Sequence, residues 1–313
     1  MINTEIYDIY HDESRQESYW HGFLFVPRSQ RQYLLELLQK ARIGAKWENH
    51  ISFKDISTRT KNKSPRVQLV ESWMSIALAS LQQKKLLKLP VSFFICGKHR
   101  EYHLGLKELI KCKFVIFKER DNHRKMFCGL SKMQKIEITL KMGAKGGIHK
   151  LFNDQEPIKI GNFVIDKFGY SSRLKSILQS FAYHVRQEKR NYVSFIKGAK
   201  IIPQDSDHNK IESSQNSDDS HFLQLCDIFL GGIRHHSYCP AVNSVKYKIS
   251  LPCRLLLNHD INNYYRMKQS RFFNGFILNK CWLENGKWQF APLELAENLL
   301  LRKFCQLKLP LKY

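Results

Sequence analysis

The sequence lacks an apolar run long enough to cross a bilayer and lacks closely spaced cysteines. A membrane-spanning helix needs about 20 predominantly apolar residues, and no stretch of the 313-residue chain approaches that length. The eight cysteines are scattered without a CxxC pair, and the start, MINTEIYDIYHDES, is polar and acidic rather than a signal peptide. We therefore expect a cytoplasmic protein with reduced cysteines and no membrane association.

Negative charge is also scarce. The chain has 28 acidic against 51 basic residues, which gives a formal net charge of +23. Residues 98–150 alone hold 14 basic and 5 acidic side chains, whereas 201–220 is acidic and polar and is expected to be a loop. A large positive surplus attracts polyanions, so nucleic acid is the expected partner, with a generally basic proteome as the alternative explanation.

Hydrophobic patterning predicts an α/β protein without internal repeats. Expected strands are 5–12, 19–26, 90–98, 111–121, 133–143 and 191–198, expected helices are 29–42, 64–85 and 219–236, and 160–187 reads as strand, turn and helix. The first two strands should form an antiparallel hairpin, with the first ending at Asp12. The segment 90–98 is typical of a central strand, while 111–121 and 133–143 alternate as if one face were solvated. Asn285-Gly286 predicts a second hairpin.

Three acids occupy places where a charge needs compensation. Asp12, followed by Glu13, closes the first strand, Asp166 closes a later strand, and Asp227 interrupts the apolar helix 219–236. If the fold brings them together, their repulsion calls for a cation, and Mg²⁺ or Mn²⁺ takes hard oxygen ligands of this type. A two-metal site would support phosphodiester hydrolysis. Gln224, one turn before Asp227, could orient that carboxylate on the same helix face.

Simpler structural explanations exist for the same residues. The run Asp12-Glu13-Ser14 also suits an ordinary exit from a strand into a turn. Asp227 could form an ion pair with Arg234 or a nearby lysine.

The acidic positions resemble the motifs of a known family. The stretch YHDESRQ…YWHGFLFV resembles the N-terminal Asp-Glu-Ser strand of the DUF3800 family, and DDSHFLQLCDIFLGGI resembles its C-terminal Ser…Gln…Asp…Gly motif. The resemblance covers about residues 5–240 and implies a ribonuclease H-like fold with metal-dependent nuclease activity, in bacterial defence or mobile-element settings. It implies roles for Asp12, Glu13, Asp166, Gln224 and Asp227, and for Ser220 as a motif residue. The similar stretch WENHISFKDI, taken as a second strand region, adds Glu48 as a fourth acid.

These observations together predict the following organisation. A ribonuclease H-like mixed sheet flanked by helices occupies residues 1–240, with a basic insertion near 99–155, and residues 241–313 form a C-terminal α+β appendage packed on that core. The expected function is a Mg²⁺- or Mn²⁺-dependent nuclease acting on DNA or RNA. Asp12, Asp166 and Asp227 would be metal ligands, and Glu13 or Glu48 a further ligand or general base. The alternatives are a non-catalytic subunit that binds nucleic acid or a protein partner, and a small-molecule phosphohydrolase.

Overall fold

The computed structural model describes residues 4–14, 19–57, 64–81, 91–95, 98–102, 110–119, 138, 142–148, 151–152, 157–166, 193–211, 214–237, 244–251, 253, 256, 275–285 and 287–293. The helical part of 160–187 and much of the expected insertion at 99–155 lie outside the described residues.

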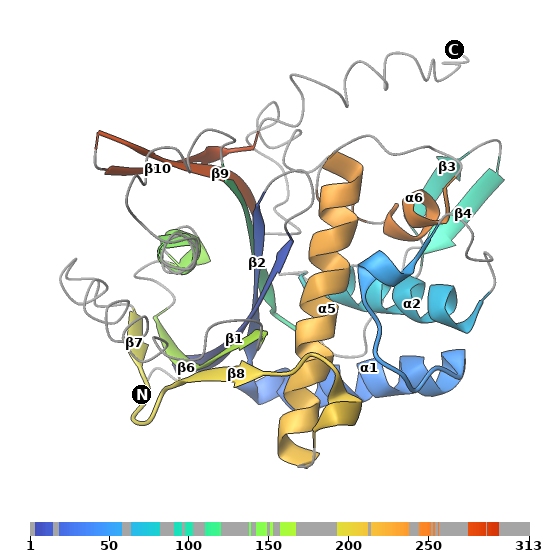
Figure 1. Cartoon of the computed structure of the whole chain (residues 1–313), viewed down its shortest axis with the longest axis horizontal. Helices are drawn as coiled ribbons and strands as arrows, with labels where there is room; N and C mark the ends of the chain where they lie inside the picture. The colour runs from blue at the N-terminus through green and yellow to red at the C-terminus, as the bar shows by residue number, and fades with distance from the viewer. Residues whose placement is uncertain are drawn as a thin grey trace.

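An eight-stranded mixed sheet forms the centre of the molecule (Figure 1). Its strands are β1 (Glu5–Ser14), β2 (Trp20–Pro27), β5 (Lys113–Glu119), β6 (Ile158–Asp166), β7 (Val193–Phe195), β8 (Ile201–Gln204), β9 (Phe276–Glu284) and β10 (Lys287–Pro292). They follow the order β10-β9-β5-β2-β1-β6-β7, and β8 also pairs with β6. A mixed α/β sheet was predicted, and this coarse prediction is confirmed.

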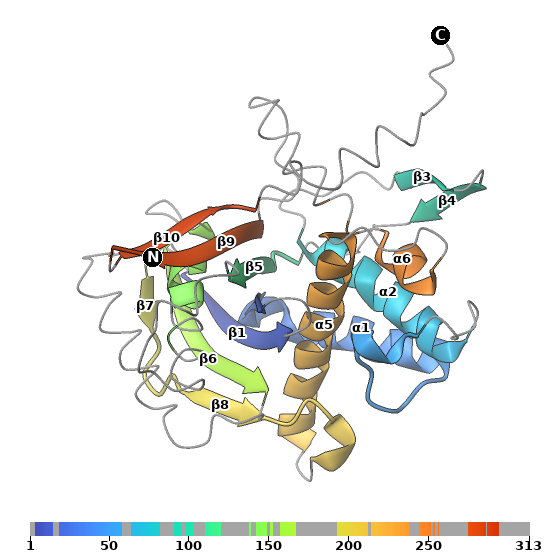
Figure 2. The ribbon, with the colours of Figure 1, turned by 45° about the horizontal axis from the view of Figure 1, so that its top comes forward.

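Strand direction reverses at three places in the sheet, between β1 and β2, between β2 and β5, and between β9 and β10. β1, β2 and β5 are antiparallel neighbours, β6 runs parallel to β1, and β7 and β8 run parallel to β6. On the other side, β9 runs parallel to β5 and forms the predicted hairpin with β10. Figure 2 shows β1, β6 and β8 ending on the side of the sheet near the long helix α5. The carboxyl ends of β1 and β6 therefore share one edge.

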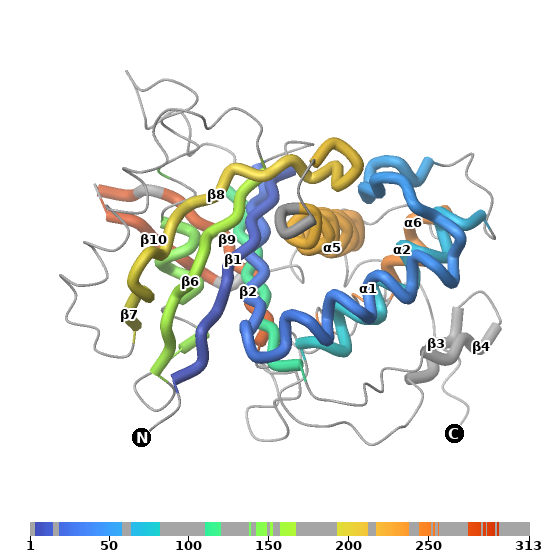
Figure 3. Tube along the Cα trace, turned by 90° about the horizontal axis from the view of Figure 1, so that it is seen from below, coloured from blue at the N-terminus to red at the C-terminus, as the bar shows by residue number. Residues whose placement is uncertain are grey.

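Helices cover both faces of the sheet. The described helices with full bounds are α1 (Arg31–Ala45), α2 (Pro65–Ser80), α5 (Ser214–Ser237) and α6 (Val245–Ser250), joined by the 3₁₀ turns η1 (Arg28–Gln30), η2 (Phe53–Asp55) and η4 (His208–Lys210). Helix α5 lies between the sheet and the α1/α2 pair (Figure 3). A helical segment at 142–148 packs on the opposite face against residues of β2 and β5. No described helix has the length and apolarity needed to cross a membrane.

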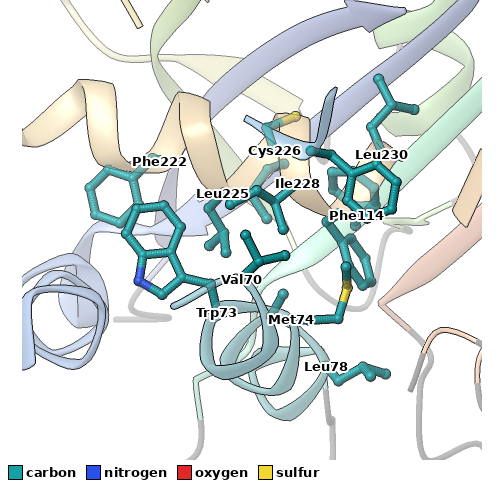
Figure 4. Packing of buried hydrophobic residues seen from close by; sticks show 14 of the residues in the cluster. Val70, Trp73, Met74, Leu78, Phe114, Phe222, Leu225, Cys226, Ile228 and Leu230 are labelled. Atoms are coloured by element: carbon teal, nitrogen blue, oxygen red, sulfur yellow. The ribbon is translucent and has the colours of Figure 1, made fainter. Parts of the chain in front are cut away.

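The core between α5 and its neighbours explains why this helix is apolar almost all round. Figure 4 shows Phe222, Leu225 and Ile228 of α5 gathered with Trp73 of α2 and Phe114 of β5. The indole and both phenyl rings are fully buried. Removing a buried side chain of this size costs about 3–5 kcal/mol. The α5 backbone, and any functional group on it, is thus held firmly against the sheet.

Local sequence signals account for the helix starts and hairpins. Ser64 caps α2, accepting a hydrogen bond from the Val67 N–H at 3.4 Å, and Pro65 occupies the first helical position, which proline favours. Asn285 has a φ of 50° in the turn between β9 and β10, a left-handed conformation that asparagine adopts more readily than most residues. Both features were readable from the sequence.

Several element predictions are wrong. The first strand does not end at Asp12 but continues to Ser14, because Asp12 pairs with Gly22 and Glu13 with His21 in the β2 ladder. The expected central strand 90–98 instead forms β3 (Val91–Ile95), which pairs with β4 (Lys98–Tyr102) in a separate two-stranded sheet. The acidic 201–220 segment is not a loop throughout, since it holds β8, η4 and the start of α5.

The expected solvated strand pair is also corrected. β5 is buried along nearly its whole length, because β2 and β9 flank it and both of its faces are covered. Lys113, whose charge suggested exposure, is buried: its ammonium donates to the Leu151 carbonyl at 3.0 Å and lies 4.3 Å from the Phe152 ring centroid. The described parts of 133–143, at 138 and 142–143, are helical rather than strand. β5 is thus a central strand and not part of an insertion.

The C-terminal segment joins the main sheet rather than standing apart from it. β9 forms a parallel ladder with β5, with Phe276 opposite Phe114 and Cys281 opposite Glu119. Helix α6 contributes Ile249 to the same apolar cluster as α5. The described part of 241–313 therefore completes the core, which differs from the expected appendage.

Candidate active site

Asp12 lies at the edge of the sheet facing α5. Side chains alternate along a strand, and Tyr10, two residues earlier, is fully buried in the cluster shared with α5. Asp12 is on the same face, near the carboxyl end of β1, which continues to Ser14. Its carboxylate therefore points toward the helix that carries Asp227.

Asp166 reaches the same edge from the neighbouring strand. β1 and β6 are parallel, with His11 opposite Ile165 in the register, so the residues that follow them, Asp12 and Asp166, are adjacent. Parallel strands bring their carboxyl ends to one edge, where α/β folds bind ligands. The predicted position of Asp166 at the end of its strand is confirmed.

Asp227 approaches from α5 and is held by the turn that follows α1. The Phe53 backbone N–H donates to Asp227 Oδ2 at 2.8 Å. This approach requires Gly231, one turn further along the helix, because a Cβ there would lie 2.5 Å from Phe53 Cβ and Cγ. Among the described residues Asp227 forms no ion pair at contact distance. Its negative charge interacts with the Lys246 ammonium of α6 over a longer range.

A single cavity of about 350 Å³ unites these acids. Its walls come from the carboxyl ends of β1 and β6, from the turn around η2, from Ser206 in the loop after β8, and from one side of α5. The lining residues are His11, Asp12, Glu13, Ser14, His50, Ser52, Phe53, Lys54, Asp166, Ser206, Leu223, Gln224, Asp227, Gly231 and Arg234. Five of the six predicted site residues thus line one cavity, the exception being Glu48.

The electrostatics of the cavity centre on Asp12. Burial raises the pKa of the Asp12 carboxyl well above its usual value, and the negative charges of Asp227 and Asp166 raise it further. Asp12 Oδ2 is buried and has no hydrogen-bond partner within the described chain. A buried carboxylate beside two others is unfavourable unless a proton or a cation compensates the charge. The arrangement of the three carboxylates therefore favours the binding of a proton or a cation.

The donor set fits a hard divalent cation in chemistry. Carboxylate oxygens from Asp12, Asp166 and Asp227 are the ligands that Mg²⁺ and Mn²⁺ prefer. Within the described residues, however, no three or more His, Cys, Asp or Glu side chains are grouped as a metal-coordinating set. Asp12, Asp166 and Asp227 share the cavity and interact through their charges.

The Gln224 side chain forms hydrogen bonds with Arg42 and with the surrounding loops, not with Asp227. Its Oε1 accepts from Arg42 at 2.5 Å and from the Ile51 N–H at 3.3 Å. Its Nε2 donates to the Ser206 carbonyl at 2.6 Å and lies 3.2 Å from His208 Nδ1. The amide thus joins α5 to the turns on both sides of the cavity, and its hydrogen bonds go to these groups instead of the neighbouring carboxylate.

The remaining predicted residues take different places. Glu13 lines the cavity and is partly exposed. Glu48 is exposed in a turn, not a strand, and its backbone carbonyl lies 2.9 Å from His208 Nε2. Ser220, the motif serine, is buried and donates to the Asp205 carbonyl at 2.6 Å, fixing the loop after β8.

Sequence reasoning missed the cations and loop residues that complete the cavity. Lys54, His50 and Ser206 line it, and buried Arg42 supports it from α1. The stretch WENHISFKDI was predicted to contribute Glu48 to the site, whereas Phe53 and Lys54 of this stretch line the cavity. Arg42 carried a detectable signal, since it falls on the apolar side of a predicted amphipathic helix, where a cation needs a partner.

No protein-family model matches the sequence, and no curated protein matches it significantly.

Proposed function

We propose that the protein is a Mg²⁺- or Mn²⁺-dependent nuclease that hydrolyses phosphodiester bonds of DNA or RNA. The observation that carries the proposal is the convergence of Asp12, Asp166 and Asp227, from two strand ends and one helix, in one cavity. A binding module has no need to gather carboxylates where a polyanion must approach, whereas a metal-dependent hydrolase does. The +23 charge of the chain supports nucleic acid as the substrate.

In this proposal the three aspartates hold the divalent ion or ions. The bound metal would supply Lewis-acid activation of the attacking water and charge stabilisation for the leaving oxygen. The protein fixes the ligands before substrate arrives: Asp12 and Asp166 sit on paired strands, and Asp227 is held by the Phe53 N–H. Glu13, at the partly exposed rim, is the available general base.

The strand order supports the ribonuclease H-like part of the proposal. Three antiparallel strands, β1, β2 and β5, are continued beyond β1 by the parallel β6. Asp12 lies near the carboxyl end of β1, Asp166 ends β6, and Asp227 lies on the helix that covers this edge. Fold likeness alone does not establish activity, so the proposal rests on the site. We further propose a cytoplasmic location, in the defence or mobile-element setting that the family resemblance implies.

Two rival functions have specific support. The lack of a coordinating group among the described residues favours a non-catalytic subunit that binds nucleic acid or a protein. The cavity volume of about 350 Å³ is at the small end of the range of roughly 300–1,000 Å³ for small-molecule sites, which favours a small-molecule phosphohydrolase. Both rivals predict no cleavage of a nucleic acid strand.

A cleavage assay separates these functions. Labelled single-stranded and double-stranded DNA and RNA are incubated with the protein in Mn²⁺, in Mg²⁺ and in EDTA. We expect metal-dependent cleavage of at least one substrate, lost in Asp12→Asn and retained in Glu36→Gln, which removes an exposed acid on α1. Absence of cleavage for every substrate, or equal cleavage by Asp12→Asn, would reject the proposal.

A further inference from the structure

The turn at residues 47–55, here called the rim loop, forms one wall of the cavity. His50, Ser52, Phe53 and Lys54 from this loop all line it. The loop has little regular structure apart from η2. Its position must therefore come from contacts with other elements.

Those contacts are numerous and come from three helices. Arg42 of α1 donates to the carbonyls of Trp47 and Asn49, at 3.4 and 2.7 Å. Gln224 and Asp227 of α5 accept the N–H groups of Ile51 and Phe53. Arg66 of α2 donates to the Asp55 carbonyl at 3.2 Å and stacks over the Trp47 ring, 4.7 Å from its centroid.

The loop thereby fixes the backbone of Lys54 directly beside the acidic site. Phe53, the preceding residue, is the one whose N–H contacts Asp227. Lys54 is exposed and lines the cavity. In the described part of the chain Lys54 has no ion-pair partner, and the neighbouring Asp55 carboxylate instead accepts the Ser52 N–H at 3.0 Å.

The negative charge of the cavity suggests a role for Lys54 in binding an anion. Four carboxylates line the cavity, from Asp12, Glu13, Asp166 and Asp227, and they repel a phosphate. A lysine ammonium on a flexible stem is a compact point charge well suited to a phosphate oxygen. An exposed, uncommitted lysine on a rigid loop at the mouth of an acidic cavity is placed to attract an anion without neutralising the acids.

We propose that Lys54 is the phosphate-binding residue of the cavity and contacts a non-bridging oxygen of the nucleic acid backbone next to the carboxylates. The inference rests on the proposed function in naming nucleic acid as the ligand. It adds to that function the residue that binds the phosphate, and it places the nucleic acid strand against the rim loop. Because the contact is to phosphate, it contributes affinity and orientation but no base preference.

The test measures binding and turnover for Lys54→Gln, Lys54→Arg and the control Lys40→Gln. Lys40 is an exposed lysine on α1 that does not line the cavity, so its substitution removes the same charge elsewhere. Binding is measured in EDTA with labelled single-stranded DNA and RNA oligonucleotides over a series of salt concentrations. Turnover is measured in Mn²⁺.

We expect Lys54→Gln to weaken binding about tenfold, the loss of one charge-assisted contact, and to reduce the log-log salt slope by about one. KM should rise while kcat changes little, and Lys54→Arg should retain most of the affinity. Equal effects of Lys54→Gln and Lys40→Gln would overturn the inference, as would a wild type that binds neither strand. Binding that depends on Lys54 without any cleavage would reject the nuclease but keep the phosphate contact.

Discussion

The backbone N–H of Phe53 donates to Asp227 Oδ2 at 2.8 Å, and this contact joins the rim loop to helix α5. It is permitted by Gly231, whose missing side chain leaves the space that the Phe53 side chain occupies. An apolar helix tolerates Asp227 because a backbone donor from a distant loop satisfies one of its oxygens.

Gly231→Ala tests this relationship directly. The new Cβ would lie 2.5 Å from Phe53 Cβ, so the rim loop must move and Asp227 loses its donor. We expect a loss of about 1–3 kcal/mol in the free energy of unfolding and a strong fall in cleavage. The matched control is Gly44→Ala in α1, where nothing lies within 4 Å of the new Cβ and the stability should rise by up to about 1 kcal/mol. Equal stability of both variants in urea melts would contradict the account.

Arg42→Met tests whether the rim loop depends on its buried anchor. Arg42 donates to two carbonyls of the loop and to Gln224, and it stacks over Trp73, 4.8 Å from the ring centroid. Methionine keeps much of the apolar contact but leaves the acceptors unpaired, at about 1–3 kcal/mol for a buried group. Hydrogen exchange at the N–H groups of Ile51 and Phe53 should accelerate more than exchange in β1. Unchanged protection at both positions would show that the loop is held by other contacts.

His221→Phe tests the pH dependence of stability. Burial, followed by the positive charge of Arg42, lowers the pKa of His221 to about 3, and His221 Nδ1 is buried without a hydrogen-bond partner in the described chain. Because the folded state resists protonation, stability is complete above the unfolded pKa of about 6.5 and is lost as pH falls toward 3, at up to about 1.4 kcal/mol per pH unit.

Phenylalanine cannot titrate and keeps the ring contact with Trp73, whose centroid lies 6.2 Å away. The variant should therefore lose less stability than wild type between neutral and mildly acidic pH. Thermal melts at matched ionic strength provide the measurement. Parallel pH profiles for the two proteins would mean that His221 does not carry this dependence.

Mn²⁺ should stabilise the folded protein through the carboxylate cluster. A ligand at 100 times its dissociation constant adds about 2.7 kcal/mol to the free energy of unfolding. In Asp12→Asn, the removal of one buried charge should raise the metal-free melting temperature and shrink the response to Mn²⁺. An ion-pair role for Asp12 predicts the opposite, a lower metal-free melting temperature and no response in wild type.

The sequence predicted the acidic positions better than the elements around them. Asp12, Asp166 and Asp227 were recognisable because each breaks an apolar pattern, and strand ends and helix periodicity are local signals. The charge of Lys113 led to the wrong prediction that β5 has a solvated face. Its ammonium is instead buried and donates to the carbonyl of Leu151, 38 residues away. The role of Phe53 could not be read either, because a backbone N–H leaves no signal in residue type and its partner is 174 residues away.

The most direct test of the central claim is the cleavage activity of Asp227→Asn in Mn²⁺. Asparagine is nearly isosteric and its carbonyl can still accept the Phe53 N–H, so the fold and oligonucleotide binding in EDTA should persist. It supplies no anionic oxygen, so metal-dependent cleavage should fall by at least about 100-fold. A folded Asp227→Asn protein that cleaves at the wild-type rate, or a wild type that cleaves no DNA or RNA in Mn²⁺, would contradict the account.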